Sequence, residues 1–116
     1  MPAFAFVAPL LPGKEQVDAD AIEQATTGEH REAYIASRRA AGVTREAIWH
    51  QKTPDGTTLA IVLLEADDPA AALGYFAASD TEFDRGFRSM VEEVHGFDLA
   101  TASPPDVRLL ADTRFS

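Results

Sequence analysis

The segment from residue 43 to residue 66 has apolar side chains on both faces of a predicted hairpin. Its two arms are VTREAIWHQK and TLAIVLLEA, joined by TPDGT. A strand with one face in water alternates apolar and polar residues, whereas residues 59–64, LAIVLL, do not alternate. A short chain can cover one face of such a sheet with its own helices. Something else must cover the second face, and we expect a second copy of the chain to do so, as a homodimer.

The turn of this hairpin determines its register. Residues 53–57 fit a type I turn followed by a glycine bulge, because the proline at position 54 cannot take the positive φ of a primed turn. This turn predicts the pairs across the hairpin: Thr53 with Thr57, Gln51 with Leu59, Trp49 with Ile61, Ala47 with Leu63, and Arg45 with Glu65. Trp49 and His50 then lie on opposite faces of the sheet. A slip of one residue would exchange the two faces.

The chain before the hairpin predicts a strand and a long, mostly helical stretch. Residues 3–10 are apolar and β-prone, and a Pro-Gly turn follows them. Residues 14–41 form the helical stretch, which a Thr-Thr-Gly sequence in its middle either breaks or bends. Its apolar stripe passes through Val17 and leaves Asp18 outside. Gly42 is placed to end the helix.

Two helices follow the hairpin. The sequence Asp-Asp-Pro at 67–69 supplies an N-cap and a first-turn proline for a helix that runs to Ser79. The second helix begins near Thr81 and has the clearest amphipathic stripe of the chain, formed by Phe83, Phe87, Met90, Val91 and Val94. Asp84 and Arg88 are one turn apart on its outer side, and we expect them to form a surface pair.

The order of these elements predicts an α+β fold in a single domain, residues 1–116. With a last strand over residues 106–112, the order is strand, helix, strand, strand, helix pair, strand. This is the ferredoxin-like βαββαβ pattern, with a four-stranded antiparallel sheet and its helices on one face. The other face stays bare, in agreement with the two-faced hairpin. Two such sheets facing each other would make a dimeric α/β barrel.

Composition narrows the classes of function. Hydrophobic residues make up 46% of the chain and charged residues 25%, which is typical of a globular domain. The formal net charge of −9 argues against nucleic acid and anionic membrane surfaces as partners. The absence of cysteine excludes disulfides, thiolate metal sites and cysteine nucleophiles. The first residues lack the basic region of a signal peptide, and no apolar run is long enough to span a membrane. We therefore expect a cytoplasmic protein.

His50 is the candidate catalytic residue. It lies in the middle of a predicted strand beside Trp49, where an imidazole could act as a general base near neutral pH. The alternative is a histidine satisfied by a neighbour at the dimer interface. Trp49 would form a wall against an aromatic ligand, or it would belong to the core. His30, His50 and His95 lack the close spacing of metal ligands, so we expect no metal; His95 is placed to cap its helix.

Three further residues are candidates for ligand binding: Tyr34, Arg38 and Glu65. Tyr34 and Arg38 are one helical turn apart, so they share a face and could hold an anionic or phenolic group together. The alternative is a solvated helix end, where arginines complement the helix dipole. Glu65 either pairs with Arg45 across the hairpin or places a carboxylate at the mouth of a pocket. The predicted register favours the pair.

Several short sequences resemble those of a family of small uncharacterised actinobacterial proteins. They extend over most of the chain and comprise Leu11-Pro12-Gly13-Lys14, Ser37-Arg38-Arg39, Gly42-Val43-Thr44-Arg45-Glu46, Glu65-Ala66-Asp67-Asp68-Pro69, Phe76-Ala77-Ala78-Ser79 and His95-Gly96-Phe97-Asp98-Leu99. The wider relatives of this family are similar to the dimeric α/β barrel superfamily. That superfamily includes cofactor-free monooxygenases of antibiotic biosynthesis, haem-degrading enzymes, muconolactone isomerases and stress-responsive proteins. Its members often hold a ligand between the helices and the sheet of each protomer.

The resemblance leads to two hypotheses of function. The first is an enzyme of secondary or aromatic metabolism that needs no cofactor: a monooxygenase, isomerase or cyclase. In it His50 is the base, Trp49 a wall, and Tyr34 and Arg38 anchor a small apolar or aromatic ligand. The second is a non-catalytic homodimer that binds a ligand or serves as a structural module. Haem binding is a third hypothesis. No catalytic motif of any one member occurs in the chain, so the enzyme hypothesis rests on fold analogy.

Overall fold

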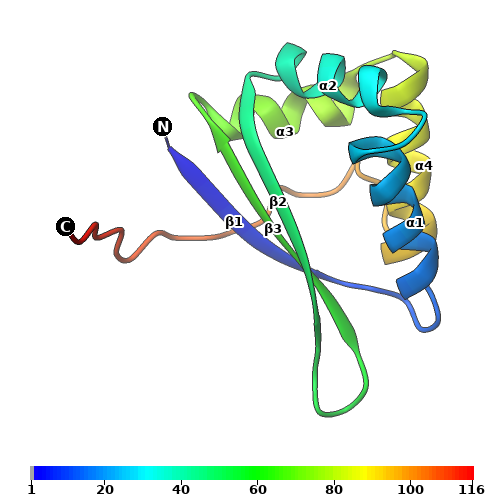
Figure 1. Ribbon diagram of the computed structural model, residues 1–116, viewed down its shortest axis with the longest axis horizontal. Helices are drawn as coiled ribbons and strands as arrows, with labels where there is room; N and C mark the ends of the chain where they lie inside the picture. The colour runs from blue at the N-terminus through cyan, green and yellow to red at the C-terminus, as the bar shows by residue number, and fades with distance from the viewer. Residues whose placement is uncertain (1) are drawn as a thin grey trace.

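A three-stranded antiparallel sheet forms one layer of the computed structural model, and four helices cover one of its faces (Figure 1). The structure describes residues 2–116. In chain order the elements are β1 (Ala3–Pro9), α1 (Glu15–Thr26), α2 (Arg31–Ala40), β2 (Val43–Lys52), β3 (Thr58–Ala66), α3 (Pro69–Ala78) and α4 (Glu82–His95). The α+β class that the sequence predicts is therefore confirmed.

β3 is the central strand of the sheet, with β1 on one side and β2 on the other. The predicted hairpin register is confirmed, since Trp49 pairs with Ile61 and the neighbouring predicted pairs follow in step. The turn also has the predicted form: Gly56 donates its N–H to the carbonyl of Thr53 at 3.0 Å and has a φ of +91°. The side chains of the hairpin therefore divide between the two faces as the sequence predicts.

The predicted last strand is absent, so the four-stranded βαββαβ sheet is wrong. Residues 106–112 form no strand, and the final part of the chain runs out past the sheet, away from α1 and α4 (Figure 1). β-propensity alone does not pair a strand, and this segment finds no cover for its apolar side chains within its own chain, since Leu109 and Leu110 are 71% and 79% exposed.

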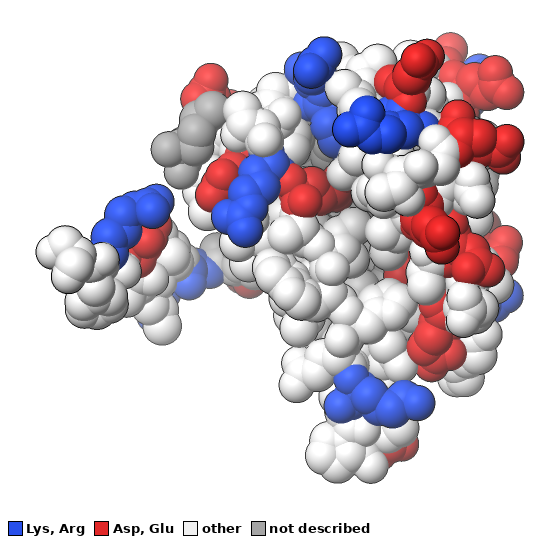
Figure 2. Space-filling view, viewed as in Figure 1, with Lys and Arg blue, Asp and Glu red and all other residues white. Residues whose placement is uncertain are grey.

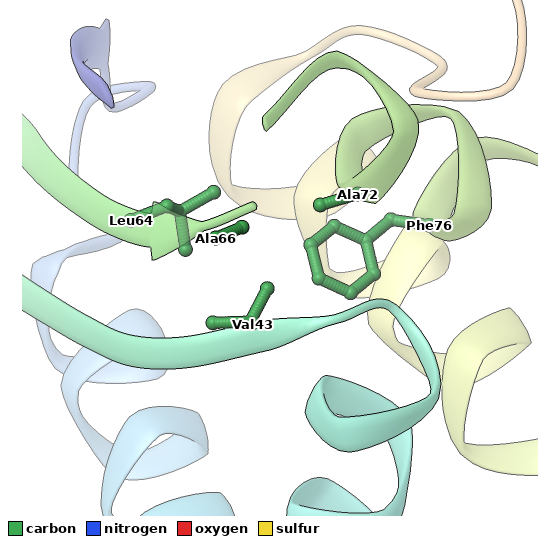
Figure 3. Packing of buried hydrophobic residues seen from close by; sticks show 5 residues of the cluster. All are labelled: Val43, Leu64, Ala66, Ala72 and Phe76. Carbon is green, nitrogen blue, oxygen red and sulfur yellow. The ribbon is translucent and has the colours of Figure 1, made fainter. Parts of the chain in front are cut away.

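One hydrophobic cluster joins α3 to the ends of the hairpin strands. Val43, Leu64, Ala66, Ala72 and Phe76 form it (Figure 3). Ala72 is completely buried, and its small side chain lets α3 approach the strands closely. Phe76 packs edge-on against the ring of Phe87, with their centroids 5.9 Å apart, and so extends the cluster to α4.

A second, smaller cluster packs α4 against the other half of the sheet. It consists of Leu10, Ala60 and Val94, with Val17 and Met90 packed against it. Leu11 continues this contact, since its N–H donates to the carbonyl of Val94 at 2.7 Å. The helices therefore pack against the sheet through two separate hydrophobic clusters.

The outer face of the sheet carries apolar side chains that no other element covers within residues 2–116. Val7 is 55% exposed and Trp49 is 50% exposed, and Ile61 and Leu63 lie between them on β3. The hairpin is thus apolar on both faces, as the sequence predicts, and the helices cover one face only (Figure 1).

Two glycines have structural reasons for their positions around α2. A Cβ on Gly28 would lie 2.8 Å from the backbone Cα of Gln24, too close for any other residue, so the chain can leave α1 tightly only with glycine there. The Thr-Thr-Gly sequence therefore breaks the helical stretch into two helices. Gly42 has a φ of +81° and ends α2 as predicted.

None of the helices in the described chain is both long enough and apolar enough to span a membrane.

Asp84 is fully buried, so the predicted surface pair with Arg88 is wrong. The carboxylate accepts hydrogen bonds from the hydroxyls of Ser37 at 2.5 Å, Ser79 at 2.5 Å and Thr81 at 2.8 Å. Arg88 instead donates to the backbone carbonyl at the end of α3. The reason is the helical period, because position 84 lies three residues before position 87 on the inward stripe of α4.

Hydrogen bonding decides the charge state of this buried carboxylate. Burial by itself raises the pKa of Asp84, but the hydrogen bonds from Ser37, Ser79 and Thr81, together with the charge of Arg38, outweigh it. The pKa of Asp84 therefore lies below its ordinary value of 3.8, and the group is a carboxylate at neutral pH.

Replacing Asp84 with alanine should lower the free energy of unfolding by about 3 kcal/mol, because three hydroxyl groups lose their acceptor inside the protein. Urea denaturation at neutral pH measures this loss. Asp80→Ala is the matched control, since the Asp80 carboxylate is exposed and meets only the exposed side chain of Arg85, at 3.4 Å. A loss in Asp84→Ala no larger than in the control would contradict the structural role of this carboxylate.

Candidate functional site

A cavity of about 170 Å³ lies between the helices and the inner face of the sheet, among the two hydrophobic clusters. All four helices and all three strands contribute to its wall. Most of the wall is apolar and includes Phe6, Ile48, Val62, Leu73, Phe87 and Met90. The cavity therefore has the position in which the superfamily resemblance leads us to expect a ligand.

The volume of the cavity limits the size of any ligand. Pockets for drug-sized molecules have about 300–1,000 Å³, whereas an apolar cavity of about 150 Å³ is enough to bind benzene. At about 170 Å³ the cavity has room for a molecule with one ring and a small substituent. Four alanines in its wall keep this space open: Ala8, Ala21, Ala25 and Ala60.

One end of the cavity carries a hydrogen-bonded group of Tyr34, Arg38 and Glu46. The phenol of Tyr34 donates to Oε1 of Glu46 at 2.6 Å, and Nε of Arg38 donates to the same oxygen at 3.0 Å. The side chains of Arg38 and Glu46 are only 9% and 8% exposed. The structure thus brings together two predicted ligand-binding residues, and the alternative of a solvated helix end is wrong for Arg38.

Aromatic rings enclose the charge of Arg38. Its guanidinium carbon lies 4.9 Å from the ring centroid of Tyr34, 4.4 Å from that of Phe76 and 4.7 Å from that of Phe87. These distances are typical of cation–π contacts. Nη1 of Arg38 also donates to the hydroxyl of Ser37 at 3.1 Å, and that hydroxyl donates to Asp84. The two carboxylates and one guanidinium of this network leave a net formal charge of −1.

The phenol of Tyr34 stays protonated over a wide range of pH. Burial raises its pKa, and both the charge of Glu46 and the hydrogen bond to it raise the pKa further, while Arg38 offsets part of the effect. The pKa of Tyr34 is consequently well above its ordinary value of 10. In this network the phenol therefore acts as a hydrogen-bond donor to Glu46.

A carboxylate–imidazole pair lies at another part of the wall. Oδ2 of Asp18 on α1 is 2.7 Å from Nε2 of His50 on β2. Asp18 lines the cavity, whereas His50 does not, and the side chain of His50 is 26% exposed. The predicted base His50 therefore contacts a residue of the cavity wall, Asp18, and its own side chain is partly accessible to solvent.

Sequence reasoning missed Asp18 and placed it off the apolar stripe of its helix. The structure buries it, and the wall of the cavity includes Asp18, Ala21, Ile22 and Ala25. These positions have the spacing i, i+3, i+4 and i+7 of one helical face. That spacing was the available signal. The predicted stripe through Val17, Ala21 and Ala25 does face the interior, and the buried face extends beyond it to Asp18 and Ile22.

His95 also lines the cavity, from the last turn of α4. Its Nδ1 lies 2.8 Å from the backbone carbonyl of Pro9, which is the end of β1. The expected capping of its own helix is therefore wrong, since this bond is to another element. A carbonyl can only accept, so Nδ1 carries a proton and Nε2 of the neutral ring has a lone pair.

Two of the predicted site residues lie on the outer face of the sheet, away from the cavity. Trp49 is half exposed there. Glu65 is 3.5 Å from Nη1 of Arg45, so the predicted hairpin pair is confirmed. The structure therefore separates Trp49 and Glu65 from the residues of the cavity wall.

Acidic side chains gather along the side of the molecule formed by α1 and α4, and the middle of the same view carries few charges (Figure 2). No three histidine, aspartate or glutamate side chains of residues 2–116 are grouped so that they could hold a metal ion.

No protein-family model, no curated protein and no solved structure matches this chain. The chemistry of the cavity must therefore be inferred from its own residues.

The buried phenol should make stability depend on alkaline pH. Because the folded state raises the pKa of Tyr34, its stabilising effect is complete below the ordinary pKa and is lost as pH rises above about pH 10. Tyr34→Phe should lower the free energy of unfolding by about 1–2 kcal/mol at neutral pH and reduce its further decrease in alkali. Urea denaturation at several pH values measures both effects.

Tyr75→Phe is the matched control for this substitution at neutral pH, because the Tyr75 hydroxyl makes no hydrogen bond to the described residues. Its loss of stability should be smaller than that of Tyr34→Phe. If the wild type and Tyr34→Phe lost the same amount of stability in alkali, the raised pKa would be ruled out.

Proposed function

We propose that this protein is a cytoplasmic homodimer that binds a small apolar or aromatic molecule in the cavity of each protomer. The observation that supports ligand binding is the cavity itself, with its apolar wall and buried polar end. A space of about 170 Å³ leaves the apolar side chains of its wall without packing partners, which lowers stability relative to a packed core.

The residues around the cavity also favour binding over a packing defect. A core that had only a structural role would gain stability from larger side chains at the four wall alanines. It would also have no need for a buried Glu46 beside an apolar space. Small residues, a preserved volume and a few polar groups at one end are the usual attributes of a small-molecule site.

A one-ring apolar molecule should bind the wild-type protein. We expect toluene near saturation to raise the melting temperature by a few degrees, because a ligand that binds only the folded state stabilises it. Val62→Phe, which fills the cavity from β3, should abolish the shift while the protein stays folded by circular dichroism. No shift in the wild type, or an equal shift in Val62→Phe, would exclude the cavity as the binding site.

The uncovered outer face of the sheet supports the homodimer. Three strands about 5 Å apart and about 25 Å long present roughly 400 Å². A stable interface buries about 800 Å² on each partner, so the flat face alone is too small. The segment from residue 104 to residue 116 supplies further apolar area, since it runs out past the sheet with Leu109, Leu110 and Phe115 exposed (Figure 1). We propose that this segment lies against the second copy.

Sedimentation equilibrium at micromolar concentration should therefore show a dimer. Trp49→Glu places a charge in the proposed interface, beside Ile61 of the central strand, and should give a monomer. Ser89→Glu is the matched control, because it adds the same charge to an exposed position on α4, in the helix layer. A chain ending at Ser103 should dimerise at least about tenfold more weakly. A wild-type monomer would exclude the dimer, and an unchanged dimer in the shortened chain would exclude the role of the segment.

A catalytic function is the second candidate, as a cofactor-independent monooxygenase, isomerase or cyclase. The pair of Asp18 with His50 and the lone pair on His95 favour it, because each offers a proton acceptor at the cavity. The alternative is a binding protein without turnover. Chromatography of a bound ligand after incubation separates the two, since an enzyme would form product and His50→Ala would slow it. Haem, with its four pyrrole rings, is much larger than the one-ring space.

A further inference from the structure

We infer that the ligand of this cavity is an uncharged one-ring molecule bearing an O–H or N–H group, which donates a hydrogen bond to Glu46. The inference rests on the proposed binding function and specifies the chemical class of the ligand. It follows from one carboxylate oxygen and from the charges around it.

The two oxygens of Glu46 have different surroundings. Oε1 accepts both hydrogen bonds of the network, from Tyr34 and from Arg38. Oε2 accepts none from residues 2–116. All side-chain nitrogen and oxygen atoms in this part of the chain that are fully shielded from solvent have a hydrogen-bond partner. Oε2 must therefore keep some accessible surface, although the side chain as a whole is only 8% exposed.

Glu46 is part of the cavity wall, so Oε2 is the acceptor that we assign to the cavity. Without a protein donor and with little access to water, this oxygen has unused hydrogen-bonding capacity. Neither neighbouring residue donates a hydrogen bond to Oε2. The phenol of Tyr34 already donates to Oε1, and Arg38 donates to Oε1 and to Ser37 while three aromatic rings enclose it. A donor from a ligand would complete the hydrogen bonding of Glu46.

The charges of the wall exclude an anionic ligand. Arg38 is the only lysine or arginine among the described residues of the wall, and its charge is already shared by Glu46 and, through Ser37, by Asp84. Asp18 adds another carboxylate elsewhere on the wall. An anion would therefore enter a space with excess negative charge and without an unpaired cation. Of the anionic or phenolic group expected at Tyr34 and Arg38, these charges favour the phenolic one, with Glu46 as the acceptor of its hydrogen bond.

The size and apolarity of the remaining wall determine the rest of the ligand. A permanently charged cation would lose its hydration in a space lined mainly by hydrocarbon and aromatic groups. A neutral molecule such as a phenol loses less hydration free energy than a cation and still supplies a hydrogen-bond donor. The ligand class is therefore phenol-like: one ring and one donor.

Phenol and toluene test this inference, because they have the same size and differ by an O–H in place of a methyl group. Their dissociation constants should be measured by calorimetry on the wild type, on Glu46→Gln and on Glu65→Gln. Glu46→Gln should weaken the binding of phenol by about tenfold and that of toluene by less than about twofold. The reason is that a hydrogen bond to a charged acceptor is stronger than one to an amide. Glu65→Gln makes the same chemical change on the outer face and should leave both constants unchanged. Benzoate should bind the wild type at least about tenfold more weakly than phenol.

The outcomes distinguish the inference from the proposed function. If neither toluene nor phenol binds the wild type, the proposed function fails. If both bind and Glu46→Gln affects them equally, or if benzoate binds more tightly than phenol, the inference fails and the cavity remains a binding site. Should Glu46→Gln not fold, the carboxyl carbon-13 shift of Glu46 in the wild type gives the same information. It should move on addition of phenol and not of toluene, and an equal response to both would overturn the inference.

Discussion

The enclosed guanidinium of Arg38 is the interaction on which the rest of the structure depends. It contacts Glu46 on β2 directly, and it reaches Asp84 on α4 through the hydroxyl of Ser37. A charge buried in an apolar layer without such partners would cost several kcal/mol. The folded chain must therefore hold α2, β2 and α4 in one mutual arrangement. The polar end of the cavity is the surface of this network, so the site and the packing of the helices have a common physical origin.

Two polar parts of the cavity wall, at Glu46 and at Asp18, differ in their access to water. The carboxylate of Glu46 is almost completely shielded, and its hydrogen bonds come from the buried Arg38 and the partly buried Tyr34. The imidazole of His50 is partly exposed and touches the cavity only through Asp18. A shielded carboxylate is suited to orienting a ligand, because water does not compete for it. A pair in contact with solvent is suited to exchanging protons. Recognition and any chemistry would therefore be carried out by different residues.

The structural features that the sequence predicted correctly depend on residues close together in the chain. Those that it missed depend on contacts between residues far apart in the chain. The hairpin register was correct because the proline at position 54 and the glycine after it leave one turn type, and period-two alternation then assigns the faces. The last strand was wrong because pairing depends on an edge elsewhere in the molecule, and β-propensity alone does not specify it. Asp84 and Asp18 were placed outside because carboxylates are usually solvated. Their burial is favourable only because of partners elsewhere in the fold. Asp84 accepts hydrogen bonds from serine and threonine hydroxyls, and Asp18 pairs with His50.

The central position of β3 has a consequence for how this protein can change over evolutionary time. Successive residues of the strand point to opposite sides, so Val62 meets the cavity while Ile61 meets the outer face. A substitution at an even-numbered position of this strand alters one compartment and leaves the chemistry of the other in place. In the proposed homodimer, alternate residues of this nine-residue strand would thus determine which partner binds and which ligand binds. Each property could then be altered by mutation with little effect on the other.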